Sequence, residues 1–411
     1  MNVSSLLSIF ALPSLLSDLF SGATTGQLSC LYSVDANFCD RYFGKFYYIK
    51  IFKNLKHNTY TLYTIRGDNG VPAGNDSGSL GHNNSEESTS TLSRPRHFEP
   101  WARELELMHH YCISTSSTLA LREDMQYVWR VVFPQEGYLH GFVLHGVLAL
   151  SALHKAHLLP HERRTYLTLS AYYQTRGQEV FRTLLSNITD ENWRPIFCFA
   201  SMVIVYVCSF PARSENHQAT APILRTLDIF TVIRGIDATL ARFTCRIGKT
   251  NLAPLARGAW LNVDDEADPH LEYSQLPHET FHKLTQLQSF FEENLRPQQK
   301  SAYVRAVSAL RLLAKHIALA GLHLEIGSVF IWPYSIPESI IADIRGLKPY
   351  ALILLSYFTV FLATADHSYW FLEGWSVQLL DDIDRHLRDQ QGFREWLAWP
   401  TKNVRLRAGH K

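Results

Sequence analysis

An acidic cluster at Asp264, Asp265, Glu266 and Asp268 is the feature of the sequence that comes closest to a catalytic motif. Carboxylates in the D-D-x-x-D spacing can hold Mg²⁺, and the bound ion can then bind the oxygens of a diphosphate. Pro269 follows the cluster directly, which favours a loop over a helix that lines a cavity. A second magnesium motif, with Asn or Asp, Ser and Glu at helical spacing, is absent from the sequence. We therefore interpret the cluster as a solvated acidic loop.

Three histidines, His154, His157 and His161, have a spacing that could present two imidazoles to a metal ion on one helix. Pro160 starts a new helix between them and no nearby acid completes a site, so we interpret them as an exposed, polar helix end. The adjacent pair His109-His110 points two ways from a helix, and we expect one of the two to pack inward.

Other motifs that would indicate catalysis are incomplete. The segment 245–250 ends like a phosphate-binding loop, but Phe243 occupies the position that the first glycine of that loop requires. The sequence predicts no catalytic residue, no cofactor and no metal site.

Composition and charge exclude several classes of protein. The chain of 411 residues is 46% hydrophobic and 19% charged, which supports a sizeable core and excludes disorder throughout. A formal charge of +1 provides no global attraction to nucleic acid or to an acidic membrane. The six cysteines form no C-x-x-C pair, so we expect neither a zinc ribbon nor a redox dithiol, and Cys198 and Cys208 should pack as small hydrophobic residues.

The chain divides into three predicted regions. Residues 1–65 form an atypical N-terminal segment that should be poorly structured, and they lack the positive charge that precedes the apolar core of a signal peptide. Residues 66–97, rich in Gly, Asn and Ser, read as a flexible linker. Residues 98–411 should form the folded domain.

Helical periodicity dominates from residue 98 onward, and the fold class we expect is all-α, a single large bundle of about ten helices. The clearest apolar stripes are Tyr303, Val307, Leu310, Ala314 and Ile317; Ile223, Leu227, Phe230 and Ile233; and Phe281, Leu284, Leu287, Phe291 and Leu295. Residues 142–153 should be a core helix, and Pro160 should open the helix that runs toward Asn187. The apolar runs 196–210 and 349–365 fit buried helices better than membrane spans.

From Glu104 onward, several sequence blocks appear together and in order. They are 105–119 (LELMHHYCISTSSTL), 128–158 (VWRVVFPQEGYLHGFVLHGVLALSALHKAHL), 187–207 (NITDENWRPIFCFASMVIVYV), Trp332-Pro333, Trp370, Gly374-Trp375 and 395–400 (EWLAWP). In these blocks the chain resembles the regulatory domain of fungal zinc-cluster transcription factors, in the branch named for the sterol uptake control protein.

That resemblance implies a six-cysteine zinc cluster, a linker and an all-helical domain, which in the type member binds a sterol and controls nuclear entry and activation. Only Cys30 and Cys39 precede the linker here, without the C-x-x-C spacing of the cluster, so DNA binding through that module is not carried over. Either residues 1–65 are non-native sequence that replaces the cluster, or the protein is a paralogue without one. The abrupt change in composition at the linker favours the first explanation.

We therefore expect a nuclear or cytoplasmic–nuclear transcription regulator without catalytic activity, whose helical domain senses a ligand or dimerises. The resemblance implies an apolar, sterol-like effector, which we place among residues 331–399, and a homodimer or transcriptional co-regulators as further partners. We expect no sequence-specific DNA binding by this chain and no membrane span.

The alternative is a magnesium-dependent, all-α enzyme of the terpene synthase type that uses Asp264, Asp265 and Asp268. A third possibility, a secreted helical protein, would carry glycans at Asn75 or Asn187.

Overall fold

The computed structural model describes residues 100–209, 221–257, 269, 271 and 274–409. Every element in these ranges is a helix or a helical turn, and none is a strand, so the predicted all-α fold is confirmed. The predicted segment 1–65 and the linker 66–97 lie outside the described residues, and so do the acids Asp264, Asp265 and Asp268.

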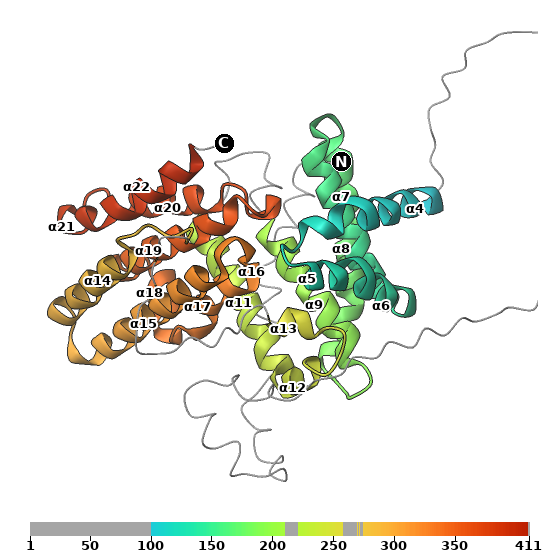
Figure 1. The fold of residues 1–411 in the computed structure, drawn as a ribbon, viewed down its shortest axis with the longest axis horizontal. Helices are drawn as coiled ribbons and strands as arrows, with labels where there is room; N and C mark the ends of the chain where they lie inside the picture. The colour runs from blue at the N-terminus through green and yellow to red at the C-terminus, as the bar shows by residue number, and fades with distance from the viewer. Residues whose placement is uncertain (1–99, 210–220, 258–268, 270, 272–273, 410–411) are drawn as a thin grey trace, which may run out of the picture.

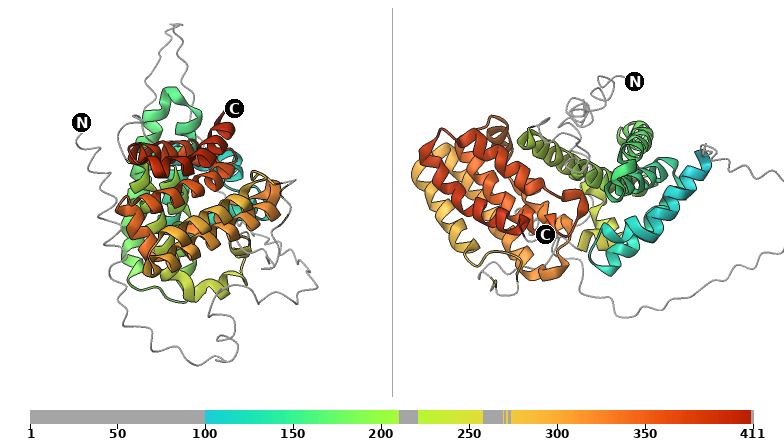
Figure 2. Two further views of the ribbon diagram at one scale, coloured as in Figure 1. Left: turned by 90° about the vertical axis from the view of Figure 1, so that its left-hand side faces the viewer. Right: turned by 90° about the horizontal axis from the view of Figure 1, so that it is seen from above.

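The helices form two groups that are joined by a middle set (Figures 1 and 2). The first group holds α4 (Pro100–His110), the turns η2 (Tyr111–Thr115) and η3 (Ser116–Thr118), α5 (Glu123–Tyr127), η4 (Val128–Val132), α6 (Phe133–Leu139), α7 (Gly141–Leu158), η5 (Pro160–Glu162), α8 (Arg163–Leu185) and α9 (Trp193–Cys208). The middle set holds α11 (Pro222–Leu240), η6 (Ala241–Phe243), α12 (Thr244–Ile247) and α13 (Ala253–Arg257). The second group holds α14 (Thr280–Asn294), α15 (Pro297–Ala320), η7 (Gly321–His323), α16 (Ile326–Val329), α17 (Ile331–Ser335), α18 (Glu338–Arg345), α19 (Pro349–Asp366), η8 (Trp370–Leu372), α20 (Trp375–Leu387), α21 (Gln391–Arg394), η9 (Glu395–Leu397) and α22 (Ala398–Ala408).

Helix α19 is the central helix of the second group. Its residues 351–365 are all buried, as the apolar run predicts. The three hydroxyls that interrupt the run, on Ser356, Thr359 and Thr364, each donate to a backbone carbonyl one turn earlier, at 2.6–2.7 Å, so each of the three is satisfied within the core. Among the described residues α19 is the one helix whose length and apolarity would suffice to cross a membrane, and 83% of that stretch is buried inside the protein.

Aromatic packing connects α19 to α11 and α17. The Trp332 ring stacks on Phe358 with a centroid distance of 4.6 Å, and the Phe230 ring meets both of them edge-on. The indole N–H of Trp332 donates to the Ala306 carbonyl on α15 at 3.0 Å, so this buried polar atom is also satisfied. Four helices far apart in the sequence therefore share one core.

In the first group, α8 packs closely on α7 and α9 because Gly177 has no side chain. A Cβ at this position would overlap the ring of Phe199 on α9 and lie 3.1 Å from the Phe142 carbonyl on α7. The core helix predicted for 142–153 is confirmed as part of α7. The helix expected from Pro160 begins later, because residues 160–162 form the turn η5 and α8 starts at Arg163.

The predicted apolar stripes are confirmed on α11, α14 and α15, where all but one of their residues are buried. The exception is Phe281, which is half-buried at the start of α14. Cys198 and Cys208 are buried among apolar side chains, as expected.

Candidate functional site

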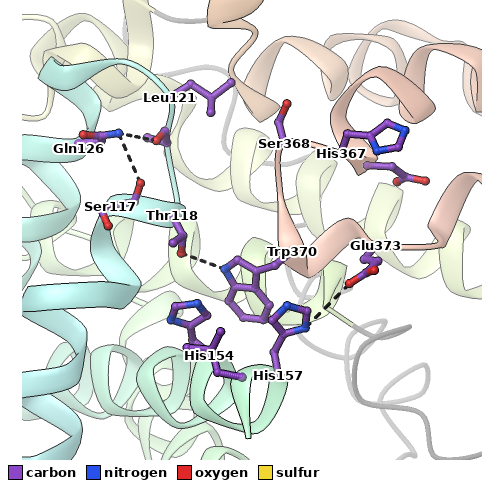
Figure 3. A pocket seen from close by; sticks show the side chains of 13 residues that line it. Ser117, Thr118, Leu121, Gln126, His154, His157, His367, Ser368, Trp370 and Glu373 are labelled. Atoms are coloured by element: carbon purple, nitrogen blue, oxygen red, sulfur yellow. Dashed lines mark hydrogen bonds and ion pairs between the residues drawn. The ribbon is translucent and has the colours of Figure 1, made fainter. Parts of the chain in front are cut away.

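A pocket of about 460 Å³ opens between the first and second groups of helices, and we call it the inter-group pocket (Figure 3). Its walls come from the segment around η3, from the last turns of α7 and from the connection between α19 and α20. The lining residues are Ser117, Thr118, Ala120, Leu121, Gln126, His154, His157, Leu158, Asp366, His367, Ser368, Trp370 and Glu373. Because both groups contribute walls, the pocket requires the two groups to be packed together. Its volume is in the range of small-molecule sites.

His154 lines the pocket from α7 although its side chain is buried, with 4% of its surface exposed. Its Nδ1 lies 3.1 Å from the hydroxyl of Thr115, which is fully buried. The Thr115 hydroxyl has no other hydrogen-bond partner among the described residues, so we assign it as the donor, which places the hydrogen of the neutral imidazole on Nε2. Burial, reinforced by the imidazoles of His110 and His157, lowers the pKa of His154 to about 4. At neutral pH the ring is therefore an uncharged N–H donor.

Trp370 connects the two groups across the pocket. It begins η8, and its indole N–H donates to the Thr118 hydroxyl oxygen at 2.9 Å (Figure 3). Its ring centroid lies 5.0 Å from that of His154 and 5.4 Å from that of His157, with both pairs tilted by about 30°. One indole therefore supplies a flat apolar surface beside two imidazoles.

Glu373 faces His157 at the rim, with 4.0 Å between the carboxylate Oε2 and Nδ1. The chain can turn from η8 into α20 at this point because Gly374 adopts a φ of 81°, in the left-handed region that favours glycine. Asp366, at the end of α19, accepts from the backbone N–H and the hydroxyl of Ser376 and so orients the start of α20. Both acids of the pocket are thus positioned by the α19–α20 connection.

A buried carboxylate next to the pocket also holds the groups together. Glu325 is 1% exposed, and it accepts from the backbone N–H groups of Leu121 at 3.0 Å and Arg122 at 2.7 Å and from the hydroxyl of Tyr369 at 2.9 Å. Burial raises the pKa of Glu325, although these hydrogen bonds oppose the shift. Burial, together with the neighbouring Glu325 carboxylate, also raises the pKa of Tyr369 well above its ordinary value. Leu121 belongs to this cluster, and Trp370 directly follows Tyr369. The cluster therefore fixes two residues that line the pocket.

The structure separates the histidines that the sequence analysis considered together. The interpretation of an exposed helix end is wrong for His154, which is buried against Trp370, and right for His161, which is exposed in η5. His109 is exposed, while His110 packs inward with its ring centroid 5.3 Å from that of His154. Within the described ranges, no group of three His, Cys, Asp or Glu residues is arranged to hold a metal ion.

The sequence analysis did not identify Thr115, Thr118 and Gln126 as lining or supporting residues of a site. Trp370 was noted only as part of a resemblance, without a role. No local pattern relates Thr118 to Trp370, because the contact arises from tertiary packing across 252 residues. The one sequence signal that could have indicated the site is His154, a hydrogen-bonding side chain in the second half of an apolar helix.

Comparison with known proteins relates the chain to a distant relative. No protein-family model matches the chain. A curated protein from Gibberella zeae, described as a "Zn(2)-C6 fungal-type transcription factor", is 21% identical over 311 residues, which are 73% of this chain and 61% of that protein. The aligned chain thus spans less than two thirds of the relative's length. The similarity relates the chain distantly to a transcription regulator and gives no support to the magnesium-dependent enzyme.

Proposed function

We propose that the chain acts in the nucleus as a transcription regulator and that its helical domain is the regulatory module. The observation that carries this proposal is the 21% identity over 311 residues to a fungal Zn(2)-C6 transcription factor. The all-helical architecture supports it, because the resemblance seen in the sequence blocks implies such a domain. No catalytic role is part of the proposal.

We propose further that the chain reaches its target genes through a partner protein. The six cysteines of the sequence lack the spacing of a zinc cluster, and the formal charge of +1 provides little attraction to phosphates. A gel-shift titration of the full chain on duplex DNA should therefore show weak, salt-sensitive binding without sequence preference. Tight, sequence-selective binding would refute this part of the proposal. The partner is either a second copy of this chain bound to a co-regulator or a co-regulator alone.

An apolar, sterol-like effector among residues 331–399 remains part of the proposal. The support is the resemblance, together with the apolar character of α19 and the helices around it. A ligand that binds only the folded state raises the melting temperature as its concentration increases. Ergosterol in a thermal-shift titration of the full chain is the probe, and an unchanged melting temperature at saturating ergosterol would remove this effector from the proposal.

The regulator proposal is tested by chromatin occupancy. The full chain carrying an epitope tag is crosslinked in its native host, and the DNA that is recovered with it is sequenced. We expect enrichment at discrete promoters, which requires nuclear entry and recruitment together. Uniform recovery across the genome, with the tagged chain intact and expressed, would contradict the proposal.

A further inference from the structure

Among the buried titratable groups of the described residues, His154 combines burial with an open hydrogen-bonding position. Its Nδ1 is occupied by Thr115, while no described side chain or backbone group lies within hydrogen-bonding distance of Nε2. Nε2 is also not among the polar atoms that are sealed from solvent without a partner. Since the ring lines the inter-group pocket, the Nε2–H group faces into it (Figure 3). A bound molecule with an acceptor inside the pocket would satisfy a donor placed this way.

Gln126 lies on another wall of the pocket. Its amide nitrogen donates to the Ala120 carbonyl at 3.0 Å and the Ser117 carbonyl at 3.4 Å. That network fixes the orientation of the amide and leaves the oxygen as an acceptor without a protein donor among the described residues. Gln126 lines the pocket with its amide nitrogen already bonded to two carbonyls, so the His154 N–H group is the fixed donor that a bound molecule must satisfy.

The charges of the lining select against anions, and its hydrogen-bonding groups select against an ammonium group. The lining contains the carboxylates of Asp366 and Glu373 but neither lysine nor arginine, so a bound carboxylate or phosphate would be repelled. A bound ammonium group has only hydrogen atoms to offer, and therefore cannot accept from the His154 N–H group. An uncharged molecule with an acceptor meets both conditions.

The apolar part of the lining defines the rest of the molecule. The Trp370 ring presents its flat surface beside the two imidazoles, and Leu121 and Leu158 add aliphatic surface. Planar groups pack well against an indole face. We propose that the inter-group pocket binds an uncharged, planar small molecule with an amide-like head, whose acceptor receives the His154 Nε2–H.

This site shares one wall, the connection between α19 and α20, with the range 331–399 proposed for the apolar effector, and it differs from that effector site in chemistry. It lies between the groups, and the molecule contacts α7 and the segment around η3 on one side and η8 on the other. A bound molecule therefore stabilises the packing of one group on the other. If this packing controls transcription, a consequence that rests on the proposed function, the site is a place where a metabolite acts on the regulator.

Three probes with the same ring and different head groups test the proposal directly. Benzamide, benzoate and benzylamine are titrated separately against the full chain, and binding is followed by saturation-transfer NMR. We expect benzamide to bind about tenfold more tightly than either charged probe, because it loses no hydrogen bond and meets no like charge. Equal binding of the three, tighter binding of a charged probe, or no benzamide binding up to its solubility limit would overturn the proposal.

Three variants locate the probe. His154→Phe keeps the ring and removes the donor, and Leu158→Trp fills the pocket mouth from a residue that is 49% exposed and tolerant of substitution. Each should weaken benzamide binding about tenfold or more. His145→Phe is the matched control, because His145 lies on the same helix and packs against Tyr173 away from the pocket. Benzamide binding that survives both Leu158→Trp and His154→Phe would place the probe elsewhere and refute the site.

Binding is measured on the chain alone, whereas the proposed function is measured by promoter occupancy. Absence of benzamide binding would therefore leave the regulator proposal standing, and absence of promoter occupancy would leave the binding site standing.

Discussion

The indole N–H of Trp370 donates to the hydroxyl of Thr118 at 2.9 Å, although 252 residues separate the two in the sequence. Thr118 in turn donates its own hydrogen to the Thr115 carbonyl at 2.7 Å. Thr115 is also the residue that orients His154. A single line of hydrogen bonds thus connects η8 of the second group to η3 and α7 of the first. It determines the shape of the inter-group pocket.

Replacing Trp370 by Phe should weaken the contact between the groups. The variant keeps an aromatic ring but removes the donor to Thr118, and we expect the free energy of unfolding to fall by about 1–2 kcal/mol. Urea denaturation of the full chain measures the change. Trp101→Phe is the control, since Trp101 is 62% exposed and should change stability by less than about 0.5 kcal/mol. Equal stability of Trp370→Phe and the wild type would contradict the role of this hydrogen bond.

The Glu325 carboxylate should make stability depend on pH in a defined direction. Because its pKa is raised in the folded state, the fold favours the protonated form, and stability relative to Glu325→Gln should fall as the pH rises from about 4 to 7. Glu325→Ala should cost about 3 kcal/mol near pH 4 and less as the pH rises, because it leaves the backbone N–H groups of Leu121 and Arg122 without their acceptor, whereas Tyr369 can still donate to the Leu324 carbonyl. Unfolding free energies of wild type and both variants across this range check both statements. A stability of the wild type relative to Glu325→Gln that increases with pH would contradict the first statement.

His154 should produce the opposite dependence. Its pKa is lowered to about 4 in the folded state, so the stability it provides is present above the ordinary histidine value and is lost as the pH falls toward 4. Between pH 7 and pH 4.5 the wild type should lose about 2 kcal/mol more than His154→Phe. His161→Phe, at the exposed position in η5, should follow the wild type. Parallel pH profiles for the wild type and His154→Phe would show that His154 is not a buried, neutral ring.

Glycine substitutions test the close packing of α7, α8 and α9. Gly177→Ala should destabilise the fold by about 1–3 kcal/mol, because the new methyl group overlaps the rigid Phe199 ring and crowds the Phe142 carbonyl. Gly146→Ala should cost less, since the atom it meets is the flexible end of Met202, at 2.6 Å, and alanine favours the helix. Gly141→Ala, with no atom within 4 Å, is the control. Thermal denaturation ranks the three, and a larger effect at Gly146 than at Gly177 would contradict the packing account.

The sequence was sufficient to predict the fold class and the buried faces of the long helices. A stripe of period 3.6 indicates which face of one helix is buried, which is why the stripe of Tyr303, Val307, Leu310, Ala314 and Ile317 is correctly placed in the core. Helix starts were less accurate. Pro160 is compatible with the first position of a helix, but it begins a 3-10 turn here, and only the position of Arg163 defines the start of α8.

The inter-group pocket could not be predicted, because it depends on how separate helices pack together. On its own helix His154 lies near the C-terminal end, a position that is usually exposed. It is buried because η8 places Trp370 over it, and η8 is positioned by the turn at Gly374 and by the hydrogen bond from Tyr369 to Glu325. None of these contacts joins neighbours in the sequence. The acids at 264–268 lie outside the described residues, so their interpretation as a loop remains a prediction.

The central claim, that the chain regulates transcription, is tested most directly by a tethered reporter. The full chain is fused to a heterologous DNA-binding domain, and transcription is measured from a promoter that carries the matching site. We predict a several-fold change relative to the DNA-binding domain alone, and the same change in a variant with Asp264, Asp265 and Asp268 all replaced by Ala. Reporter activity equal to that of the DNA-binding domain alone, with the fusion intact and nuclear, would contradict the claim.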